Sequence, residues 1–456
     1  MIRKLNNRRI FIAVLLSVLL FGMGLACTAV DPIGEASVET AIPTVFAVTT
    51  ELYFSPSPET TASPTPTPVP TPVPTPIVAT IGAVGDIMIP SAYISDAKQE
   101  DGTYDFLPQF AAWRELFSEP DFFCANLETP LGGERYPYSG KQNPETGLYE
   151  FNAPDILAAQ LKELGIDLLT TGNNHCLDCG AEGLYRTVSV LREQGFVQLG
   201  TYLDETDRSE LCIVDINGIR VGFVSATMYI NSRTSHMLTD EALVAINQLM
   251  QNGEIAPSVL DEIRALRTAG AEYIIVFPHW DTSDIQTEPT ERVRSFADAM
   301  LKAGADLILG SHPHQIRVAE YRTVEREDGT TYTGPVLYSL GNFSCNMSFY
   351  CSVGLYVRLT LEKDLVTDTV TLKQMQYLPS LSYRGNREEG QNCSVLPVFA
   401  DPSRIDSRYP FLSRECCEEL YAAREQARSI LGADTFLTLL DGDGAVAIPP
   451  METPTP

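Results

Sequence analysis

The chain has 456 residues, 44% of them hydrophobic, which is enough apolar material for one large domain or two ordinary ones. Its formal net charge of -27 argues against a nucleic-acid partner, because such binding needs clustered Lys and Arg. The acidic excess is typical of a soluble acidic surface and identifies no partner by itself.

A targeting signal is predicted at residues 1–27. Basic side chains precede an uncharged apolar run, Ile10–Ala26, and Cys27 follows it. This pattern predicts a secretory signal, and Cys27 resembles the lipid-modified cysteine of a bacterial lipoprotein. Ordinary cleavage with secretion and an uncleaved N-terminal anchor are the alternatives. We therefore expect the protein at the extracellular face of the cell membrane, attached through its N-terminal lipid or anchor.

Residues 28–76 are predicted to be a disordered spacer. In residues 55–76, nine of the 22 residues are proline, within Thr-Pro and Val-Pro repeats that form extended chain rather than a packed core. The spacer would hold a main domain at residues 77–380 away from the membrane. An extension with a helix is predicted at 381–440 and a flexible tail at 441–456.

Apolar runs and helical spacing alternate from residue 77 onward. Strands are predicted at 77–84, 121–127, 166–171, 211–216, 220–226, 272–277, 306–309, 336–340, 353–361 and 368–378. Helices are predicted at 106–117, 153–164, 181–194, 258–269, 290–303 and 413–431. Asn217-Gly218 predicts a hairpin with a type I′ turn, and residues 381–412 are predicted to be irregular. The alternation with added hairpins predicts an α/β core with mixed sheets.

Polar side chains follow the ends of the predicted strands. Four of the five histidines stand directly after apolar runs, and His312 and His314 are one residue apart. Each polar residue alone would be a turn former or a helix cap, but ligands of α/β sheets bind beyond the carboxyl ends of strands. The set is Asp86, Glu128, Asn174, His175, His279, His312 and His314. It predicts a divalent metal site for Mn, Fe or Zn, which two ions could share.

Five motifs resemble those of the bacterial capsule-synthesis protein CapA family in order and spacing. They are Gly85-Asp86, Asn126-Leu-Glu128, Gly172-Asn-Asn-His175 with Asp178, His279-Trp280 and Gly310-Ser-His-Pro-His314. The resemblance covers roughly residues 77–380. It implies a calcineurin-like metallophosphatase fold, a four-layer α/β/β/α sandwich with mixed sheets, and a link to poly-γ-glutamate capsule production.

The resemblance also implies a role for each residue of the set. His175 would be catalytic, as proton donor to a leaving group, and Glu128 would bridge two metal ions. The metal ligands would be Asp86, Glu128, Asn174, His279, His312 and His314. Metallophosphatases usually have a histidine where this chain has Met88, so both one ion and two ions stay open.

Other polar residues near these motifs have two interpretations each. Asn173, Arg317 and Asn342 could bind an anionic substrate or could be structural. Asp281 stands where the family usually has glycine, and we favour a changed loop over a replacement ligand. Asp284 is a further candidate ligand.

Ten cysteines are present, two of them in a Cys-x-x-Cys formed by Cys176 and Cys179. A redox or thiolate-ligand role is one interpretation, and packing beneath the loop is the one we favour. We expect free buried thiols or a few local disulfides.

Two hypotheses of function follow. The first is a metal-dependent hydrolase or transferase acting on an anionic polymer, such as poly-γ-glutamate, or on a phosphoester. The second is a non-catalytic polymer-binding or export component of a membrane complex that synthesises poly-γ-glutamate.

Overall fold

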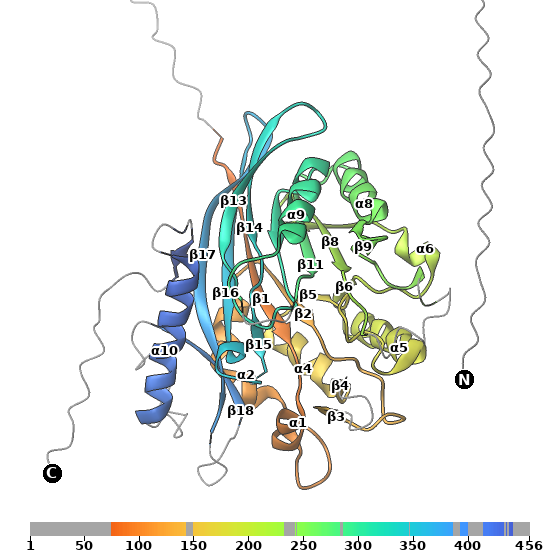
Figure 1. The fold of residues 1–456 in the computed structure, drawn as a ribbon, viewed down its shortest axis with the longest axis vertical. Helices are drawn as coiled ribbons and strands as arrows, with labels where there is room; N and C mark the ends of the chain where they lie inside the picture. The colour runs from red at the N-terminus through yellow and green to blue at the C-terminus, as the bar shows by residue number, and fades with distance from the viewer. Residues whose placement is uncertain are drawn as a thin grey trace, which may run out of the picture. The chain divides into compact units, whose positions relative to one another are not determined.

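The computed structural model describes residues 74–142, 149–231, 242, 244–282, 286–345, 347–385, 393–399, 414–432, 435 and 437–440 (Figure 1). The chain divides into two units, Met1–Pro70 and Thr71–Pro456, and the described residues all belong to the second. The predicted targeting signal with Cys27, the spacer up to residue 73, Asp284 and the predicted tail lie outside the described residues.

The larger sheet has nine strands among the described residues. In spatial order they are β18 (Cys393–Pro397), β17 (Thr369–Arg384), β16 (Val353–Asp364), β1 (Ile77–Ile87), β2 (Phe122–Leu127), β5 (Leu168–Thr170) and β6 (Val197–Leu199), with β15 (Asn342–Ser344) beside β1 and β19 (Thr438–Leu439) beside β17. Strands β1, β2, β5 and β6 are parallel to one another, whereas β16, β17 and β18 are each antiparallel to their neighbours in the spatial order. The sheet is therefore mixed.

The smaller sheet has six strands among the described residues. In spatial order they are β13 (Ala319–Glu325), β14 (Thr331–Leu337), β12 (Leu307–Leu309), β11 (Tyr273–His279), β8 (Ile219–Thr227) and β7 (Cys212–Ile216). Its four inner strands are parallel and its two edge strands antiparallel. The turn between β7 and β8 has φ of 52° at Asn217 and 87° at Gly218, as the predicted type I′ turn requires.

Two short hairpins lie outside these sheets. One joins β3 (Ser139–Gln142) to β4 (Tyr149–Asn152), and the other joins β9 (Met250–Gln251) to β10 (Glu254–Ile255).

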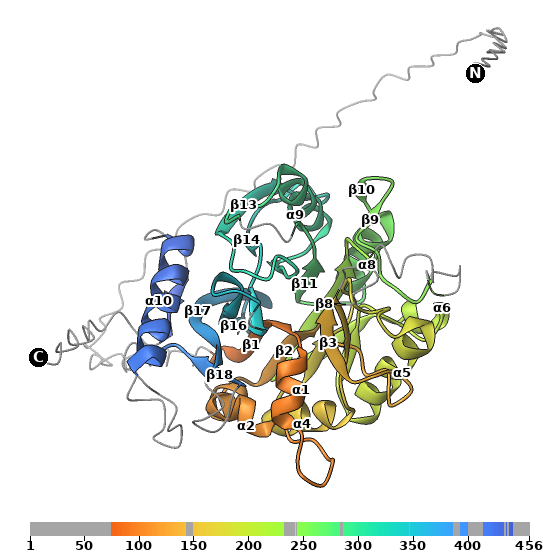
Figure 2. The same ribbon diagram turned by 60° about the horizontal axis from the view of Figure 1, so that its bottom comes forward.

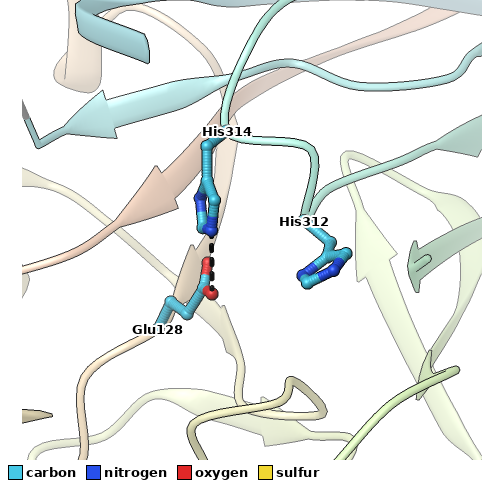
Figure 3. A group of neighbouring side chains, drawn as sticks. All are labelled: Glu128, His312 and His314. Carbon is cyan, nitrogen blue, oxygen red and sulfur yellow. Dashed lines mark ion pairs between the residues drawn. The ribbon is translucent and has the colours of Figure 1, made fainter. Parts of the chain in front are cut away.

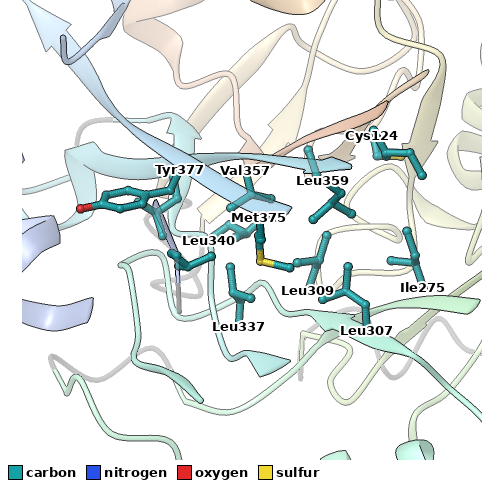
Figure 4. Close-up of a cluster of buried hydrophobic side chains, with 14 of the residues drawn as sticks. Cys124, Ile275, Leu307, Leu309, Leu337, Leu340, Val357, Leu359, Met375 and Tyr377 are labelled. Carbon is teal, nitrogen blue, oxygen red and sulfur yellow. The ribbon is translucent and has the colours of Figure 1, made fainter. Parts of the chain in front are cut away.

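The main core lies between the two sheets (Figure 4). Side chains alternate along each strand, so Cys124 of β2 and Ile275 of β11 point into this core, while Phe123 and Ile274 belong to clusters on the outer faces. This period of two places one apolar face of each sheet against the other.

Helices cover the outer faces of both sheets (Figures 1 and 2). The larger sheet carries α1 (Ser91–Ala97), α2 (Leu107–Phe110), α3 (Arg114–Ser118), α4 (Ile156–Leu164) and, near β6, α5 (Gly180–Glu193). The smaller sheet carries α8 (Pro257–Thr268) and α9 (Glu291–Ala303). These layers confirm the predicted α/β/β/α sandwich. None of the helices in the described part of the chain is long and apolar enough to span a membrane.

The C-terminal region differs from its prediction. Residues 381–384 extend β17, and β18 pairs with that extension, so nine described residues of the span predicted to be irregular belong to the sheet. The helix α10 (Arg414–Leu431) packs against β16 and β17, and it adds Cys416 and Leu420 to the core. Gly432 follows the helix with φ of 79°, the left-handed conformation expected of a helix stop.

Candidate metal centre

The polar residues predicted from the strand ends come together in one buried site. Asp86 is the second-last residue of β1, Glu128 follows β2, and His279 ends β11. The loops after β5 and β12 supply the remaining residues. The parallel register of β1 and β2 pairs Asp86 with Asn126, which brings Glu128 to the same edge. All seven residues are 9% exposed or less.

Glu128 stands at the centre of this site. Its ligand atoms lie within 4.8 Å of those of His312 and His314 in one group, and of Asp86 and His279 in another. Figure 3 shows His314 pointing towards Glu128, with 4.0 Å between Nε2 and Oε1. Because one carboxylate belongs to both groups, the arrangement suits a bridging ligand.

The surroundings of the Glu128 carboxylate indicate a cation-binding position. It is fully buried, and neither of its oxygens has a hydrogen-bond partner among the described residues. Burial, together with the nearby Asp86 carboxyl, raises the pKa of Glu128 well above its usual value. A buried polar group without a hydrogen bond is costly, and a cation removes that cost. The site therefore fits a divalent metal.

The surroundings of His279 are a second indication that the site suits a cation. Its Nε2 lies 2.7 Å from Asn174 Oδ1, 3.1 Å from His312 Nδ1 and 3.5 Å from Glu128 Oε1. A single proton on Nε2 can satisfy only one of these acceptors, whereas a bound cation would satisfy all of them. Burial and the charge of neighbouring imidazoles lower the pKa of His279 and His312 well below the usual value, so both are neutral, the form that binds metal.

Neighbouring groups orient the candidate ligands. Asn126 Nδ2 donates to Asp86 Oδ1 at 2.8 Å, and the His312 backbone N–H donates to the other oxygen at 3.3 Å. Burial raises the pKa of Asp86 to about 6 even though these bonds oppose the shift. His314 Nδ1 lies 3.0 Å from Asn342 Oδ1, which leaves Nε2 facing Glu128. Such outer partners fix the ring orientation of metal-binding histidines.

The loop after β12 is strained where it presents its two histidines. His312 has φ of 94° and His314 φ of 60°, values that cost non-glycine residues about 1–3 kcal/mol each. Gly310 allows the loop to pass close to the segment at Tyr338, because a Cβ at residue 310 would lie 2.2 Å from the Tyr338 carbonyl oxygen. Strain of this kind concentrates at functional sites.

His175 lies beside the candidate ligands together with an acidic partner. Its Nδ1 is 2.7 Å from Asp178 Oδ2, and its Nε2 is 4.0 Å from Glu128 Oε1. Asp178 also accepts a hydrogen bond from the Phe151 backbone N–H at 2.8 Å. The sequence placed Asp178 in a motif without giving it a role, although an aspartate three residues after a histidine within one turn was the available signal.

Arg317 is held inside the protein, which favours its structural interpretation. The pair it forms with Asp281 is 2.7 Å long, and both side chains are almost fully buried. The guanidinium also donates to the backbone carbonyls of Thr282 and Glu288. Asp281 is therefore the partner of Arg317 and belongs to neither candidate ligand group, while substrate contact by Arg317 stays a prediction.

The two asparagines that were candidate substrate ligands also have protein partners. Asn173 Nδ2 donates to the Leu127 carbonyl at 2.8 Å, and its Oδ1 accepts from the His175 backbone N–H at 3.2 Å. Asn342 bonds His314 and donates to the Cys351 carbonyl. Asn173 thus holds the backbone at His175, and Asn342 holds the His314 ring.

The Cys-x-x-Cys thiols are buried and free. Burial raises the pKa of Cys179 to about 12 and raises that of Cys176 as well, so both stay protonated. A Cβ on Gly132 would lie 2.5 Å from Cys179 Sγ, which shows how closely the thiol packs under the loop. The nine cysteines within the described residues are all free thiols.

Gly85 allows β1 to approach the loop before β15. A Cβ there would lie 1.9 Å from the Gly341 carbonyl oxygen, which also accepts the Asp86 backbone N–H at 3.0 Å. We expect Gly85→Ala to lower the free energy of unfolding in urea by about 3 kcal/mol and to displace Asp86. Gly102→Ala, where no atom lies within 4 Å, is the control and should cost less despite its φ of 89°. Equal costs would contradict the crowding at Gly85.

These features define a class of protein, an α/β/β/α sandwich with a buried His/Asp/Glu cluster suited to a divalent metal. The family model "Bacterial capsule synthesis protein PGA_cap" matches residues 80–347, more than half of the chain. The chain belongs to this family.

Curated relatives agree with this assignment. The "Capsule biosynthesis protein CapA" of Bacillus anthracis is 26% identical over 267 residues, covering 58% of this chain and 59% of the relative. The "PGA biosynthesis protein CapA" of Bacillus subtilis is 25% identical over 268 residues, covering 58% and 63%. The chain thus spans about 60% of the length of these relatives.

Among solved structures, a calcineurin-like phosphoesterase, YfkN of Bacillus subtilis, is 14% identical, with a TM-score of 0.39 over 77% of this chain and all of that one. A phosphatase from Mycoplasma pneumoniae is 12% identical, with a TM-score of 0.38 over 67% and 95%. The fold of this chain is defined by its own sheets and helices.

Proposed function

We propose that this chain is a metal-dependent hydrolase or transferase that acts on an anionic polymer during capsule synthesis. The observation that carries the proposal is the buried Glu128 carboxylate, shared between two groups of candidate ligands and lacking a hydrogen-bond partner among the described residues. A site built only for stability would not leave such a carboxylate without a partner.

The protein side chains have distinct roles in this proposal. Bound divalent ions would lower the pKa of a water molecule and neutralise negative charge developing on the reacting group. Asp86, Glu128, Asn174, His279, His312 and His314 would hold them. His175 would deliver a proton from Nε2, because Asp178 accepts a hydrogen bond from Nδ1 and so orients the ring.

The substrate we propose is poly-γ-glutamate, because the Bacillus subtilis relative is named a PGA biosynthesis protein. We further propose that the chain works at the extracellular face of the membrane, attached through Cys27 and held away by the Thr-Pro spacer. Substrate and location both extend beyond the family assignment, and a phosphoester is the other substrate class suited to such a metal site.

A second candidate function is a non-catalytic polymer-binding or export component of a membrane synthesis complex. The printed names of both relatives refer to biosynthesis and not to cleavage. In that case the metal would link an acidic protein to an acidic polymer. This candidate needs the metal ligands but gives His175 no task.

His175→Asn distinguishes the two candidates. We expect it to reduce shortening of poly-γ-glutamate by about 100-fold or more, the usual contribution of a proton donor, while bound metal stays unchanged. Polymer length would be measured by gel filtration and metal by mass spectrometry. Asp178→Asn should cause a smaller loss, because it leaves the imidazole in place. Undiminished shortening by His175→Asn would remove His175 as the proton donor, and no shortening by metal-loaded wild-type protein would remove the hydrolase proposal.

A further inference from the structure

An open pocket of about 480 Å³ lies next to the metal centre and contains none of the candidate ligands. It is bounded by the start of α1, the β3–β4 hairpin, the loop after β15 and the end of β17. Its lining includes Ser91, Ser95, Lys141, Phe151, Cys345 and Arg384. Figure 2 shows α1 and β3 near each other, and the two elements are in contact.

Phe151 forms a wall shared by this pocket and the metal centre. Its ring meets the His175 ring edge to face, with centroids 4.7 Å apart, and its backbone N–H donates to Asp178. Phe151 also packs with Met88 and Cys345 in a small buried cluster. A molecule lying in the pocket is therefore separated from His175 by one side chain.

The pocket is positively charged in an acidic protein. Its two charged lining residues are Lys141 and Arg384, and both are exposed. Neither forms an ion pair with any residue that the structure describes, although Glu150 stands opposite Lys141 in the hairpin. In a chain with a net charge of -27, two cations that line one pocket and have no carboxylate partner among the described residues favour an anionic ligand.

A second pocket of about 450 Å³ provides the contrast. It is lined by Arg135 and Arg186, but each arginine pairs with an acidic residue of the same lining, Glu182 and Asp155 respectively. With Glu134, this lining carries three carboxylates against two guanidiniums, so the pocket has no comparable preference for an anion.

The local backbone holds the cationic pocket in shape. Gly140 seats the hairpin against the start of α1, since a Cβ there would lie 2.5 Å from the Ile89 carbonyl oxygen. The Gly140 backbone N–H also donates to Ser91 Oγ at 3.1 Å. Arg384 is anchored across the pocket where β17 pairs with Cys393 of β18. The positions of both cations are thus set by neighbouring elements.

We propose that this pocket binds the carboxylate-bearing chain of the substrate, with Lys141 and Arg384 pairing with successive carboxylates as the chain approaches His175. The identity of the chain as substrate rests on the proposed function. The binding itself does not, and it requires neither bound metal nor turnover.

Binding of a fluorescent γ-linked oligoglutamate to the full chain, measured by anisotropy, tests the proposal. The measurement uses His175→Asn protein, so that the probe is not cut. We expect Lys141→Gln with Arg384→Gln to weaken binding about tenfold, and added salt to weaken it further. The matched control is Lys302→Gln with Arg428→Gln, which removes the same charge from exposed positions outside the pocket and should leave affinity unchanged.

The outcomes separate this proposal from the proposed function. Unchanged affinity in the Lys141 and Arg384 variant, or an equal loss in the control, would overturn the pocket assignment. Binding of inorganic polyphosphate without binding of oligoglutamate would overturn the carboxylate class. If wild-type protein never shortens the polymer but the pocket variant loses binding, the hydrolase proposal fails and the pocket stands. Unchanged urea midpoints would show that the variants fold.

Discussion

Glu128→Gln is expected to remove bound metal from the purified protein. The change keeps the size of the side chain but removes the charge that both ligand groups share. Outer partners of metal ligands are worth 10–100-fold in affinity, so loss of a shared ligand should cost on the order of 100-fold or more. Metal content after dialysis, measured by mass spectrometry, gives the result.

The same variant should change thermal stability in opposite directions with and without metal. In chelator, Glu128→Gln should be the more stable protein, because it removes a buried carboxylate that has no hydrogen-bond partner among the described residues. With excess metal the wild type should be the more stable protein, since a saturating ligand stabilises the folded state by roughly 3–4 kcal/mol. Glu262→Gln is the matched control, because Glu262 lies on α8 and its carboxylate accepts a hydrogen bond from Asn247. Full metal content in Glu128→Gln would mean that the centre is wrongly assigned.

Arg317→Met is expected to be the most destabilising change outside the metal centre. It leaves Asp281 buried, 1% exposed, without the guanidinium 2.7 Å away. Breaking a buried ion pair on one side costs about 3–5 kcal/mol, because the remaining charge stays desolvated. Urea unfolding measures the loss, and Arg317→Met with Asp281→Asn should recover part of it.

Arg264→Met provides the comparison for this pair. Arg264 and Glu327 form an ion pair whose side chains are 40% and 52% exposed, so its loss should cost less than about 1 kcal/mol. If Arg317 served the substrate instead, its replacement would weaken polymer binding while leaving the unfolding midpoint in place. That result would restore the interpretation that the structure does not favour.

The residues at the strand ends could be predicted from the sequence. Buried strands such as β2 and β12 are continuous apolar runs, so their ends are visible, and the polar residues after them stand out. Parallel strands of one sheet align their carboxyl ends, which is why Asp86 and Glu128 could be grouped from residue order. His279 belongs to the other sheet, and the packing of the two sheets brings it to the same site. Edge strands were harder, because β13 alternates apolar with charged side chains and β18 follows a polar stretch.

Contacts between distant segments were outside the reach of the sequence. Asn342 and His314 form a hydrogen bond through β15, and Asp281 and Arg317 pair across the loops that follow β11 and β12. Asn342 and Arg317 each had two plausible roles, substrate contact or structure, and residue order alone does not reveal their partners. The same holds for Lys141 and Arg384, which one pocket brings together from separate elements.

The sequence by itself determined the layered α/β architecture, the candidate ligand set and the family, because periodicity, strand ends and motif order are local properties of the chain. The tertiary structure decided which polar side chains face the shared Glu128 carboxylate and which form hydrogen bonds to those side chains, since a side chain's role depends on the atoms around it. It also showed that this carboxylate belongs to two ligand groups and that a cationic pocket adjoins His175. Both depend on through-space distances, which residue order does not contain.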